Sequence, residues 1–365
     1  MKSEVSNSIC FVAPYAYNYI NPGHEESAGG AERQQYLLGN QLLKDGYDVH
    51  YIVFKQGTHR RYENNDGMNI WKVLNPLNTK KDIIENFHSI YYYIKKINSD
   101  VYYSRGNIKL AMATSHICRL LNKKYIYAVA DDTNVTDTGS KVLNYLFRNS
   151  LKNSDLVVTQ SSHQKNLLSD SFGINSKTIP NMHHLPPESE VPDYSNRDYI
   201  LWVGRIQKEQ KKPHRFVSLA EKMPQYNFRL VGPTSDSEYS RSIIKRIEDS
   251  DNIVYSGFVK PDEIDKYYKS AYLLVNTSDY EGFPNTFLEA WSYGVPVFSY
   301  SFDLDGELVE YKIGGQYSNI SKLELEIKKL LNEECYWKSF SHSSRNHFKE
   351  NYTIDKIYPH YKNII

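Results

Sequence analysis

The fold is decided by residues 281–289, which read Glu281-Gly282-Phe283-Pro284-Asn285-Thr286-Phe287-Leu288-Glu289. Before them, the apolar run Ala271–Asn276 predicts a buried strand, and a helix is expected over residues 286–293. Gly294-Val295-Pro296 follows this helix, and residues 296–299 predict the next strand. Strand, loop, helix and strand in this order form a βαβ unit, whose two strands are parallel.

The same alternation extends along the chain in both directions. In the first half, strands are expected at residues 8–13, 48–54, 101–104, 124–130 and 156–159, with a helix at residues 31–44. In the second half, strands are expected at residues 199–204, 227–232 and 253–257, with helices at residues 215–222 and 261–270. These repeated units predict an α/β protein whose mostly parallel sheets are covered by helices on both faces.

A proline-rich stretch at residues 182–198 interrupts the alternation. We therefore expect a Rossmann-like N-terminal domain at residues 1–185, a linker at residues 186–198 and a Rossmann-like C-terminal domain at residues 199–350. Residues 351–365 remain as a C-terminal segment. Two such domains joined by one linker are expected to face a central cleft, where ligands bind.

Composition limits the class of protein and its partners. The chain has 365 residues, more than one hydrophobic core usually serves, and its 40% apolar and 24% charged residues are typical of soluble globular proteins. A net charge of +1 gives no reason to expect nucleic acid as a partner. The pairs Lys80-Lys81, Lys95-Lys96 and Lys123-Lys124 indicate either ordinary solvated helix ends or a basic face for a peripheral membrane contact.

Cysteine usage and hydropathy bear on the compartment. Cys10, Cys118 and Cys335 lie far apart, so they form no metal-binding spacing, and their odd number fits a reducing compartment. No apolar run reaches the length of a membrane-spanning helix, and the polar N-terminus around Glu4 does not resemble a signal peptide. We expect a cytoplasmic protein, with peripheral attachment at the inner face of the membrane as an alternative.

The 281–289 stretch places donors and acceptors at one helix start. The first backbone N–H groups of a helix have no partner within it, so they suit hydroxyls or a phosphate, and the start of a helix tolerates Pro284. Glu281 is expected on the loop, and Glu289 one turn beyond Asn285, which suits hydroxyls on two different rings. The alternative is a pair of acids that merely stabilise a helix N-terminus, but the full string in its setting favours a function.

A second candidate group follows the first strand of the C-terminal domain. Trp202-Val203-Gly204-Arg205 comes at the carboxyl end of that strand, and Lys208, Lys211 and Lys212 come shortly after. Arg205 and one of the lysines suit a diphosphate, whose negative charge grows as it leaves. An ordinary basic surface turn is the alternative.

A third candidate group is Gly29-Gly30-Ala31-Glu32-Arg33, which opens the first helix of the N-terminal domain. Two glycines allow close approach of a backbone or ligand, although a plain turn has the same pattern. The preceding loop, residues 14–28, is long, and long loops in compact domains are often functional.

The chain resembles glycosyltransferase family 4, whose members have the GT-B fold. The matching segments, in chain order, are Gly29-Gly30-Ala31-Glu32-Arg33, Ile179-Pro180-Asn181, Val203-Gly204-Arg205, Phe228-Arg229-Leu230-Val231-Gly232, Gly257-Phe258-Val259 and the 281–289 stretch. They span most of the chain, and the last is the most specific. The resemblance implies a retaining, metal-independent transfer of a sugar from a nucleotide-sugar donor to a glycan or lipid-linked acceptor, as in polysaccharide biosynthesis.

The resemblance also implies roles for individual residues. Arg205 and a lysine hold the donor diphosphate, Glu289 contacts the ribose, Glu281 lies near the donor sugar and the backbone around Phe258 lies beside the base. The remaining residues expected at the donor are Gly30, Gly232, Gly282, Phe283, Asn285 and Thr286. The nucleotide sugar is a co-substrate, so we expect neither a cofactor nor a metal. The segment after residue 350 is expected to pack back on the N-terminal domain.

The chain departs from the family pattern in two places. The family's phosphate lysine commonly stands five residues after the arginine, where this chain has Gln210, so Lys211 is assigned instead, with Lys212 and Lys208 as alternatives. Many members also have a histidine that faces the donor sugar, and here Asp131 or Asp132 occupies that place.

Asp131 is assigned a catalytic role with Glu281, Arg205 and Lys211, and a turn or helix cap is the alternative for both aspartates. Contacts with the acceptor or sugar are assigned to Gly29, Arg105, Asp131 and Asp132. The sequence Asp303-Leu304-Asp305 resembles a metal-binding motif, but two acids in a loop are common.

Other classes fit less well. A nucleotide-dependent oxidoreductase would carry a Gly-x-Gly-x-x-Gly turn after the first strand, and residues 8–13 are not followed by one. A nucleotide-sugar epimerase of GT-B type and a non-catalytic nucleotide-sugar-binding partner remain as alternatives. The 281–289 stretch favours the transferase over the epimerase, and the presence of Arg205, Glu281 and Glu289 argues against a non-catalytic site.

Overall fold

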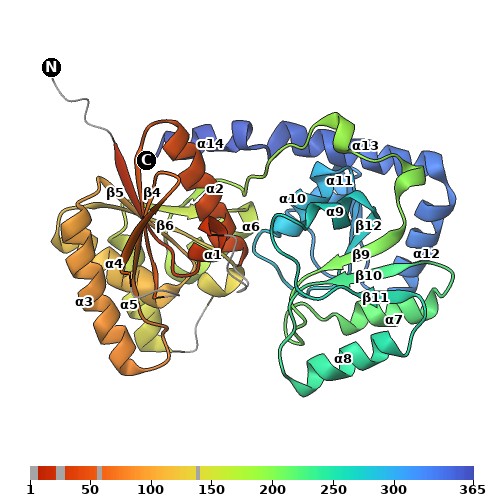
Figure 1. Ribbon diagram of the computed structural model, residues 1–365, viewed down its shortest axis with the longest axis horizontal. Coiled ribbons are helices and arrows are strands. Elements are labelled where there is room, and N and C mark those ends of the chain that lie inside the picture. Colours follow the sequence, from red (N-terminus) through yellow and green to blue (C-terminus); the bar gives the residue numbers. More distant parts are fainter. Residues whose placement is uncertain (1–6, 22–28, 56–59, 137–139) are drawn as a thin grey trace. The chain divides into compact units, whose positions relative to one another are not determined.

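The computed structural model describes residues 7–21, 29–55, 60–136 and 140–365 (Figure 1). Contacts divide the chain into two compact units. Unit 1 comprises Met1–Asn181 and Ile357–Ile365, and unit 2 comprises Met182–Lys356. Each unit is an α/β layer structure around its own sheet, so the predicted fold class is confirmed.

Unit 1 contains an eight-stranded sheet in the order β3-β4-β2-β1-β5-β6-β7-β8. The strands are β1 (Ser8–Val12), β2 (Asp48–Phe54), β3 (Tyr62–Asn65), β4 (Met68–Leu74), β5 (Val101–Arg105), β6 (Lys124–Ala128), β7 (Leu156–Thr159) and β8 (Lys177–Thr178). β3 pairs antiparallel with β4, and the other neighbours pair in parallel. The β3–β4 hairpin was not predicted, although its turn, Asp66-Gly67, is a strong hairpin signal and both residues have positive φ.

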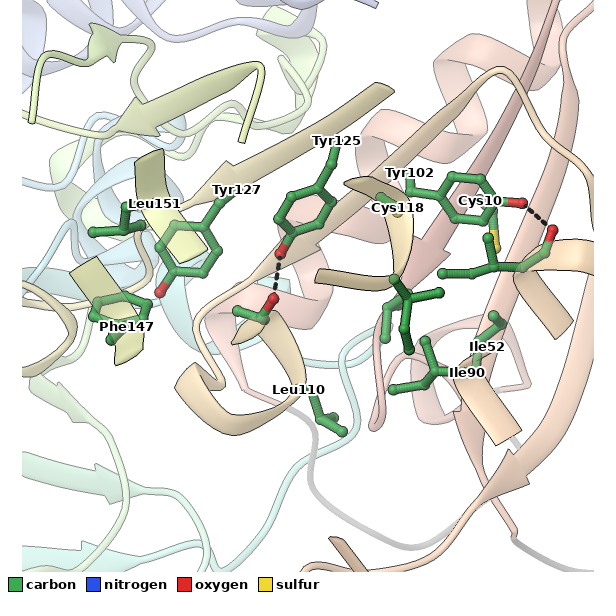
Figure 2. Packing of buried hydrophobic residues seen from close by; sticks show 14 of the residues in the cluster. Cys10, Ile52, Ile90, Tyr102, Leu110, Cys118, Tyr125, Tyr127, Phe147 and Leu151 are labelled. Atoms are coloured by element: carbon green, nitrogen blue, oxygen red, sulfur yellow. Dashed lines mark hydrogen bonds between the residues drawn. The ribbon is translucent and has the colours of Figure 1, made fainter. Parts of the chain in front are cut away.

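The helices of unit 1 follow the strands in alternation. They are α1 (Tyr17–Ile20), α2 (Gly30–Lys44), α3 (Lys80–Ile97), α4 (Ile108–Leu120), α5 (Lys141–Lys152), α6 (Ser162–Phe172) and part of α14 (Ile354–Lys362), with a short 3-10 helix, η1 (Asp132–Asn134). Figure 2 shows the core between α3, α4, α5 and the sheet. Tyr102 and Tyr127 are buried there, and their hydroxyls donate to backbone oxygens of Ile94 and Gly106. Several of the chain's 32 tyrosines are therefore core residues.

The last residues of the chain belong to unit 1. The side chains of Tyr358 and Lys362 donate to the carboxylate of Asp45 over 2.8 and 2.6 Å, and Lys124 donates to the backbone oxygen of Ile364 over 2.7 Å. The chain thus passes from unit 1 to unit 2 after Asn181 and returns after Lys356.

Unit 2 contains a six-stranded parallel sheet in the order β11-β10-β9-β12-β13-β14. The strands are β9 (Tyr199–Val203), β10 (Phe228–Val231), β11 (Ile253–Tyr255), β12 (Ala271–Asn276), β13 (Val297–Ser299) and β14 (Gly314–Gln316). The helices are α7 (His214–Lys222), α8 (Glu238–Glu248), α9 (Asp265–Lys269), α10 (Asn285–Ser292), α11 (Glu307–Glu310), α12 (Ile320–Asn332) and α13 (Glu334–Asn351). Among the described residues, no helix is both long and apolar enough to cross a membrane.

The stretch expected as a linker, residues 186–198, lies within unit 2 and packs on it. Arg197 is buried and donates to the backbone oxygens of Ala271 and Tyr293 over 2.8 and 2.7 Å. The ring of Tyr194 lies 5.4 Å from that of Trp337. The prolines keep this segment out of regular helix and sheet, while its arginine and tyrosine attach it to the body of unit 2.

Candidate active site

The carboxyl ends of three strands in unit 2 are held close together by glycines. Gly204 follows β9 and donates to the backbone oxygen of Val231, while Gly232 follows β10 and donates to that of Gly257. Gly232 has a φ of +142°, and an added Cβ would lie 1.8 Å from the backbone oxygen of Gly204. Only glycine fits at this position, and the loops after β9, β10 and β11 therefore meet at one edge of the sheet.

The loop after β9 is fastened to the loop after β12. The indole of Trp202 donates to the hydroxyl of Thr277 over 2.8 Å, and that hydroxyl donates to the backbone oxygen of Lys211 over 2.6 Å. Gln210 and Asp279 add further bonds between the two loops, because the Gln210 amide donates to the Tyr280 oxygen and the Asp279 N–H donates to the Gln210 oxygen. The positions of residues 205–212 thus depend on the loop that precedes the 281–289 stretch.

We call the two bonded loops after β9 and β12 the clasp. Its ion pairs show that the three candidate lysines have different partners. Lys211 Nζ lies 2.6 and 2.8 Å from the carboxylate oxygens of the buried Glu281, which also accepts a hydrogen bond of 2.5 Å from Ser278. Lys212 has a positive φ and contacts Asp279 instead. Lys208 is exposed. Of the three lysines, Lys211 is therefore the one that lies against the predicted sugar-binding glutamate.

Asp279 adds two further ion pairs to the clasp. Its carboxylate accepts from Lys212 and, over 2.5 Å, from Arg215, which also donates to the backbone oxygen of Thr277. Burial by itself would raise the pKa of Asp279, but the hydrogen bonds from Lys212 and Arg215 outweigh it and lower the pKa. No sequence motif marked Asp279 or Thr277 as candidates, because their role depends on a neighbouring strand.

The helix expected over residues 286–293 is present and begins one residue earlier. α10 begins at Asn285, directly after the loop that holds Gly282, Phe283 and Pro284. Glu289 is buried on the same helix and accepts a hydrogen bond from the hydroxyl of the fully buried Tyr268. Phe258, next to Gly257, is 40% exposed. Thr286 lies in the first turn of α10, and the exposed Arg205 follows β9.

At the carboxyl edge of the unit 1 sheet, the side chain of Glu32 folds back toward Gly29. Gly29 is the N-cap residue of α2, and an added Cβ would lie 2.8 Å from Oε2 of Glu32. Burial raises the pKa of Glu32, opposed by backbone N–H groups at Glu32 and Gly29 and by Arg105. Arg105 ends β5, is buried and donates to the side-chain oxygen of Asn181 over 2.5 Å. Gly29, Gly30 and Arg105 thus lie near Glu32, a residue of the same motif for which no role was predicted.

The structure gives the two neighbouring aspartates different surroundings. The carboxylate of Asp131 caps η1 by accepting from the backbone N–H of Thr133 over 2.8 Å, which is the capping role left open for it. Asp132 instead accepts from Gln164 over 3.3 Å and lies 3.4 Å from His163. Burial raises the pKa of Asp132.

Two further expectations concern metals and a loop. Asp303 accepts a hydrogen bond of 3.0 Å from the backbone N–H of Leu308 and so orders the start of α11. Within the described part of the chain, no three His, Cys, Asp or Glu side chains gather as a metal-binding group. Of the loop at residues 14–28, residues 22–28 lie outside the described residues.

The fold and these loops define the class of GT-B glycosyltransferases. Residues 28–184 match the sequence model described as Glycosyltransferase Family 4, and residues 188–353 match the one described as Glycosyl transferases group 1. Together the two matches span most of the chain, which belongs to glycosyltransferase family 4. The predicted family is therefore confirmed.

Relatives with similar sequences support the family. An uncharacterized glycosyltransferase of Haemophilus influenzae is 25% identical over 350 residues, which are 93% of this chain and 97% of that protein. The lipopolysaccharide 1,6-galactosyltransferase of Salmonella typhimurium is 30% identical over 118 residues, covering 31% of this chain and 32% of that enzyme.

Solved structures support the fold. Sucrose-phosphate synthase of Thermosynechococcus elongatus superposes with a TM-score of 0.80 at 16% identity and covers 98% of both chains. HepE of Anabaena, solved in complex with UDP and glucose, superposes with a TM-score of 0.76 at 16% identity and also covers 98% of both chains.

Proposed function

We propose that the protein transfers a sugar, with retention of anomeric configuration, from a nucleotide-sugar donor to a glycan or lipid-linked acceptor in polysaccharide biosynthesis. The observation that carries the proposal is the contact of Lys211 with Glu281 at the carboxyl edge of the unit 2 sheet. A cation for the leaving diphosphate and a carboxylate for the sugar hydroxyls are thereby neighbours. HepE, which shares the fold, was solved with UDP and glucose, which is consistent with such a donor.

In this proposal, unit 2 holds the donor. Arg205 and Lys211 neutralise the charge that develops on the departing diphosphate, assisted by the backbone N–H groups at the start of α10. Glu281 accepts hydrogen bonds from the sugar, Glu289 from the ribose, and the backbone at Phe258 lies beside the base. Because the protein's own cations perform the neutralisation, the transfer needs no metal and no cofactor.

Unit 1 is proposed to hold the acceptor. Arg105, Asp131, Asp132 and the helix start at Gly29 and Gly30 lie at or after the carboxyl ends of parallel strands of its sheet, where ligands bind in such folds. We place the reaction in the cytoplasm, with the acceptor reached there or at the inner face of the membrane.

A donor screen tests the proposal. The purified protein is incubated with a panel of uridine-, guanosine- and adenosine-diphosphate sugars, and release of the nucleoside diphosphate is measured without an acceptor. We expect slow hydrolysis of one donor, loss of that hydrolysis in Arg205→Ala, and a sugar product whose first-formed anomer has the donor's configuration. Formation of a new donor epimer without transfer would indicate the epimerase, and binding without turnover, with any acceptor supplied, would indicate a non-catalytic partner.

A further inference from the structure

Three helices on one face of the unit 1 sheet carry much positive charge. α3, α4 and α5 form one layer, in which α4 contacts both neighbours (Figure 1). They contain nine Lys and Arg residues against the two acids Asp82 and Glu85, whereas the whole chain has a net charge of +1. Neither α4 nor α5 contains an Asp or Glu, while α7, α8, α12 and α13 of unit 2 each contain a Glu. We call α3, α4 and α5 the basic helix layer.

The basic helix layer also exposes large apolar side chains. On α5, Val142, Tyr145 and Leu146 are 70%, 66% and 43% exposed, and their spacing of three and four residues places them on one side of the helix. Leu120, at the end of α4, is 72% exposed. The exposed apolar residues of α3 are Ile83, Ile84, Phe87 and Tyr92. Apolar side chains gathered on one layer in this way indicate a surface that another phase or molecule covers.

A hollow in the basic helix layer is lined by both charged and apolar side chains. It is lined by His116, Arg119, Leu120, Asn149, Lys152 and Asn153. Arg119 donates to the side-chain oxygen of Asn153, which holds its guanidinium at the hollow. Guanidinium, ammonium and amide N–H groups all donate to phosphate oxygens, so the hollow suits a phosphate group next to an exposed leucine.

We propose that the basic helix layer docks on a bilayer that contains anionic phospholipids. The apolar side chains of α5 and Leu120 enter the boundary between headgroups and acyl chains, while Lys and Arg keep their charged ends at the lipid phosphates. Nucleic acid would use the positive charge but leave the apolar side chains in water, and a second copy of the layer would bring like charges together. The proposal does not depend on the transferase activity, because the proposed donor residues lie in unit 2.

Vesicle flotation of the full-length chain tests the docking surface. We expect flotation with phosphatidylcholine vesicles that contain about 30 mol % phosphatidylglycerol, since anionic lipid attracts clustered Lys and Arg. Pure phosphatidylcholine vesicles should bind at least about tenfold less, and about 1 M salt should release the protein because it screens surface charges. Equal binding to both vesicles, or no binding to the anionic ones, would overturn the proposal.

Two variants and a matched control locate the surface. Val142→Ser/Tyr145→Ser/Leu146→Ser and Arg148→Glu/Lys152→Glu should each weaken flotation about tenfold or more, because one removes the apolar part and the other reverses charge at the exposed side of α5. The control is Val309→Ser/Leu325→Ser, which changes side chains 63% and 65% exposed on helices of unit 2 and should float like the natural chain.

The thermal unfolding midpoint of each variant reports whether it is folded. If the triple serine variant does not fold, the charge-reversed variant decides, since it changes only exposed polar groups. Unchanged flotation of the folded α5 variants, or loss of flotation in the control as well, would place the lipid contact elsewhere or reject it.

Discussion

Lys211 and Glu281 form a two-oxygen ion pair, with the ammonium nitrogen 2.6 and 2.8 Å from the two carboxylate oxygens. The lysine lies on the loop after β9 and the glutamate on the loop after β12, 70 residues later. They meet because β9 and β12 are neighbours in the sheet and because Thr277 holds the backbone of Lys211. In the proposed donor site, the pair places the cation assigned to the diphosphate next to the carboxylate assigned to the sugar.

Removal of this cation should reduce transfer strongly. We expect Lys211→Ala to lower kcat/KM roughly 30- to 1000-fold, because the charge on the leaving diphosphate is no longer neutralised. This factor corresponds to a loss of about 2 to 4 kcal/mol of transition-state stabilisation. Steady-state kinetics with the donor from the screen gives the value. The matched control, Lys208→Ala, removes an exposed lysine of the same loop and should stay near the natural rate. A larger loss of kcat/KM in Lys208→Ala than in Lys211→Ala would instead assign the diphosphate contact to Lys208.

Glu281→Gln separates sugar recognition from diphosphate binding. The amide keeps the shape of the side chain but removes the charge that engages Lys211, so the lysine is released for the diphosphate. We expect transfer to fall about 100-fold, as for other lost transition-state contacts, while affinity for the free nucleoside diphosphate is unchanged or higher. Calorimetric titration measures the affinity. A clear loss of nucleoside diphosphate affinity would show that Glu281 contacts the nucleotide.

Glu289→Ala and Asp131→Ala test the assignment of the two units. Glu289→Ala should lower nucleoside diphosphate affinity by about 1.5 to 3 kcal/mol, because a charged acceptor for the ribose hydroxyls is lost. Asp131→Ala should reduce transfer and leave that affinity almost unchanged. Both are measured by titration on variants whose folding is checked, since Glu289 also accepts from Tyr268 and Asp131 caps η1. A large loss of nucleoside diphosphate affinity in Asp131→Ala, with none in Glu289→Ala, would assign the donor to unit 1 and the acceptor to unit 2.

Activity is expected to persist in excess chelator. In the proposed donor site, Arg205, Lys211 and the helix start of α10 supply positive charge at the diphosphate, so we expect no requirement for a divalent cation. Transfer rates are compared with and without EDTA, and again after addition of Mg²⁺ or Mn²⁺. Loss of activity that returns with the metal would contradict the prediction and make Asp303 and Asp305 the first residues to test as ligands.

The clasp at Asp279 should give stability that depends on pH. The pKa of Asp279 is lowered in the folded state, so its contribution to the free energy of unfolding is present above the unfolded value of about 3.9 and is lost as pH falls through the folded value. Asp279→Asn should therefore unfold at a lower temperature than the natural chain near neutral pH, and this gap should narrow below about pH 4. Thermal unfolding at several pH values measures it. If the difference in unfolding temperature between the two chains stays constant with pH, the lost stability comes from packing and not from the charge of Asp279.

Local sequence signals predicted most of the fold. Apolar runs bounded by turn residues located the central strands of both sheets, and the 281–289 stretch located α10 and its loop. The β3–β4 hairpin was missed although Asp66-Gly67 and the apolar residues of β4 marked it, while its other strand, β3, is polar and lies at the edge of the sheet. The stretch at residues 186–198 was interpreted from its prolines, while the burial of Arg197 against β12 and α10 depends on residues distant in sequence.

The sequence by itself determined the fold class, the family and the loops that carry the candidate site, because these depend on periodicity and on short motifs. Only the tertiary structure decided among neighbouring, chemically equivalent residues. Lys211 and Lys212 are adjacent lysines, and which one faces Glu281 depends on the backbone at Lys212, with its positive φ, and on the clasp to Thr277 and Asp279. Such a choice requires the positions of side chains from separate strands, and local sequence does not specify the contacts between distant segments.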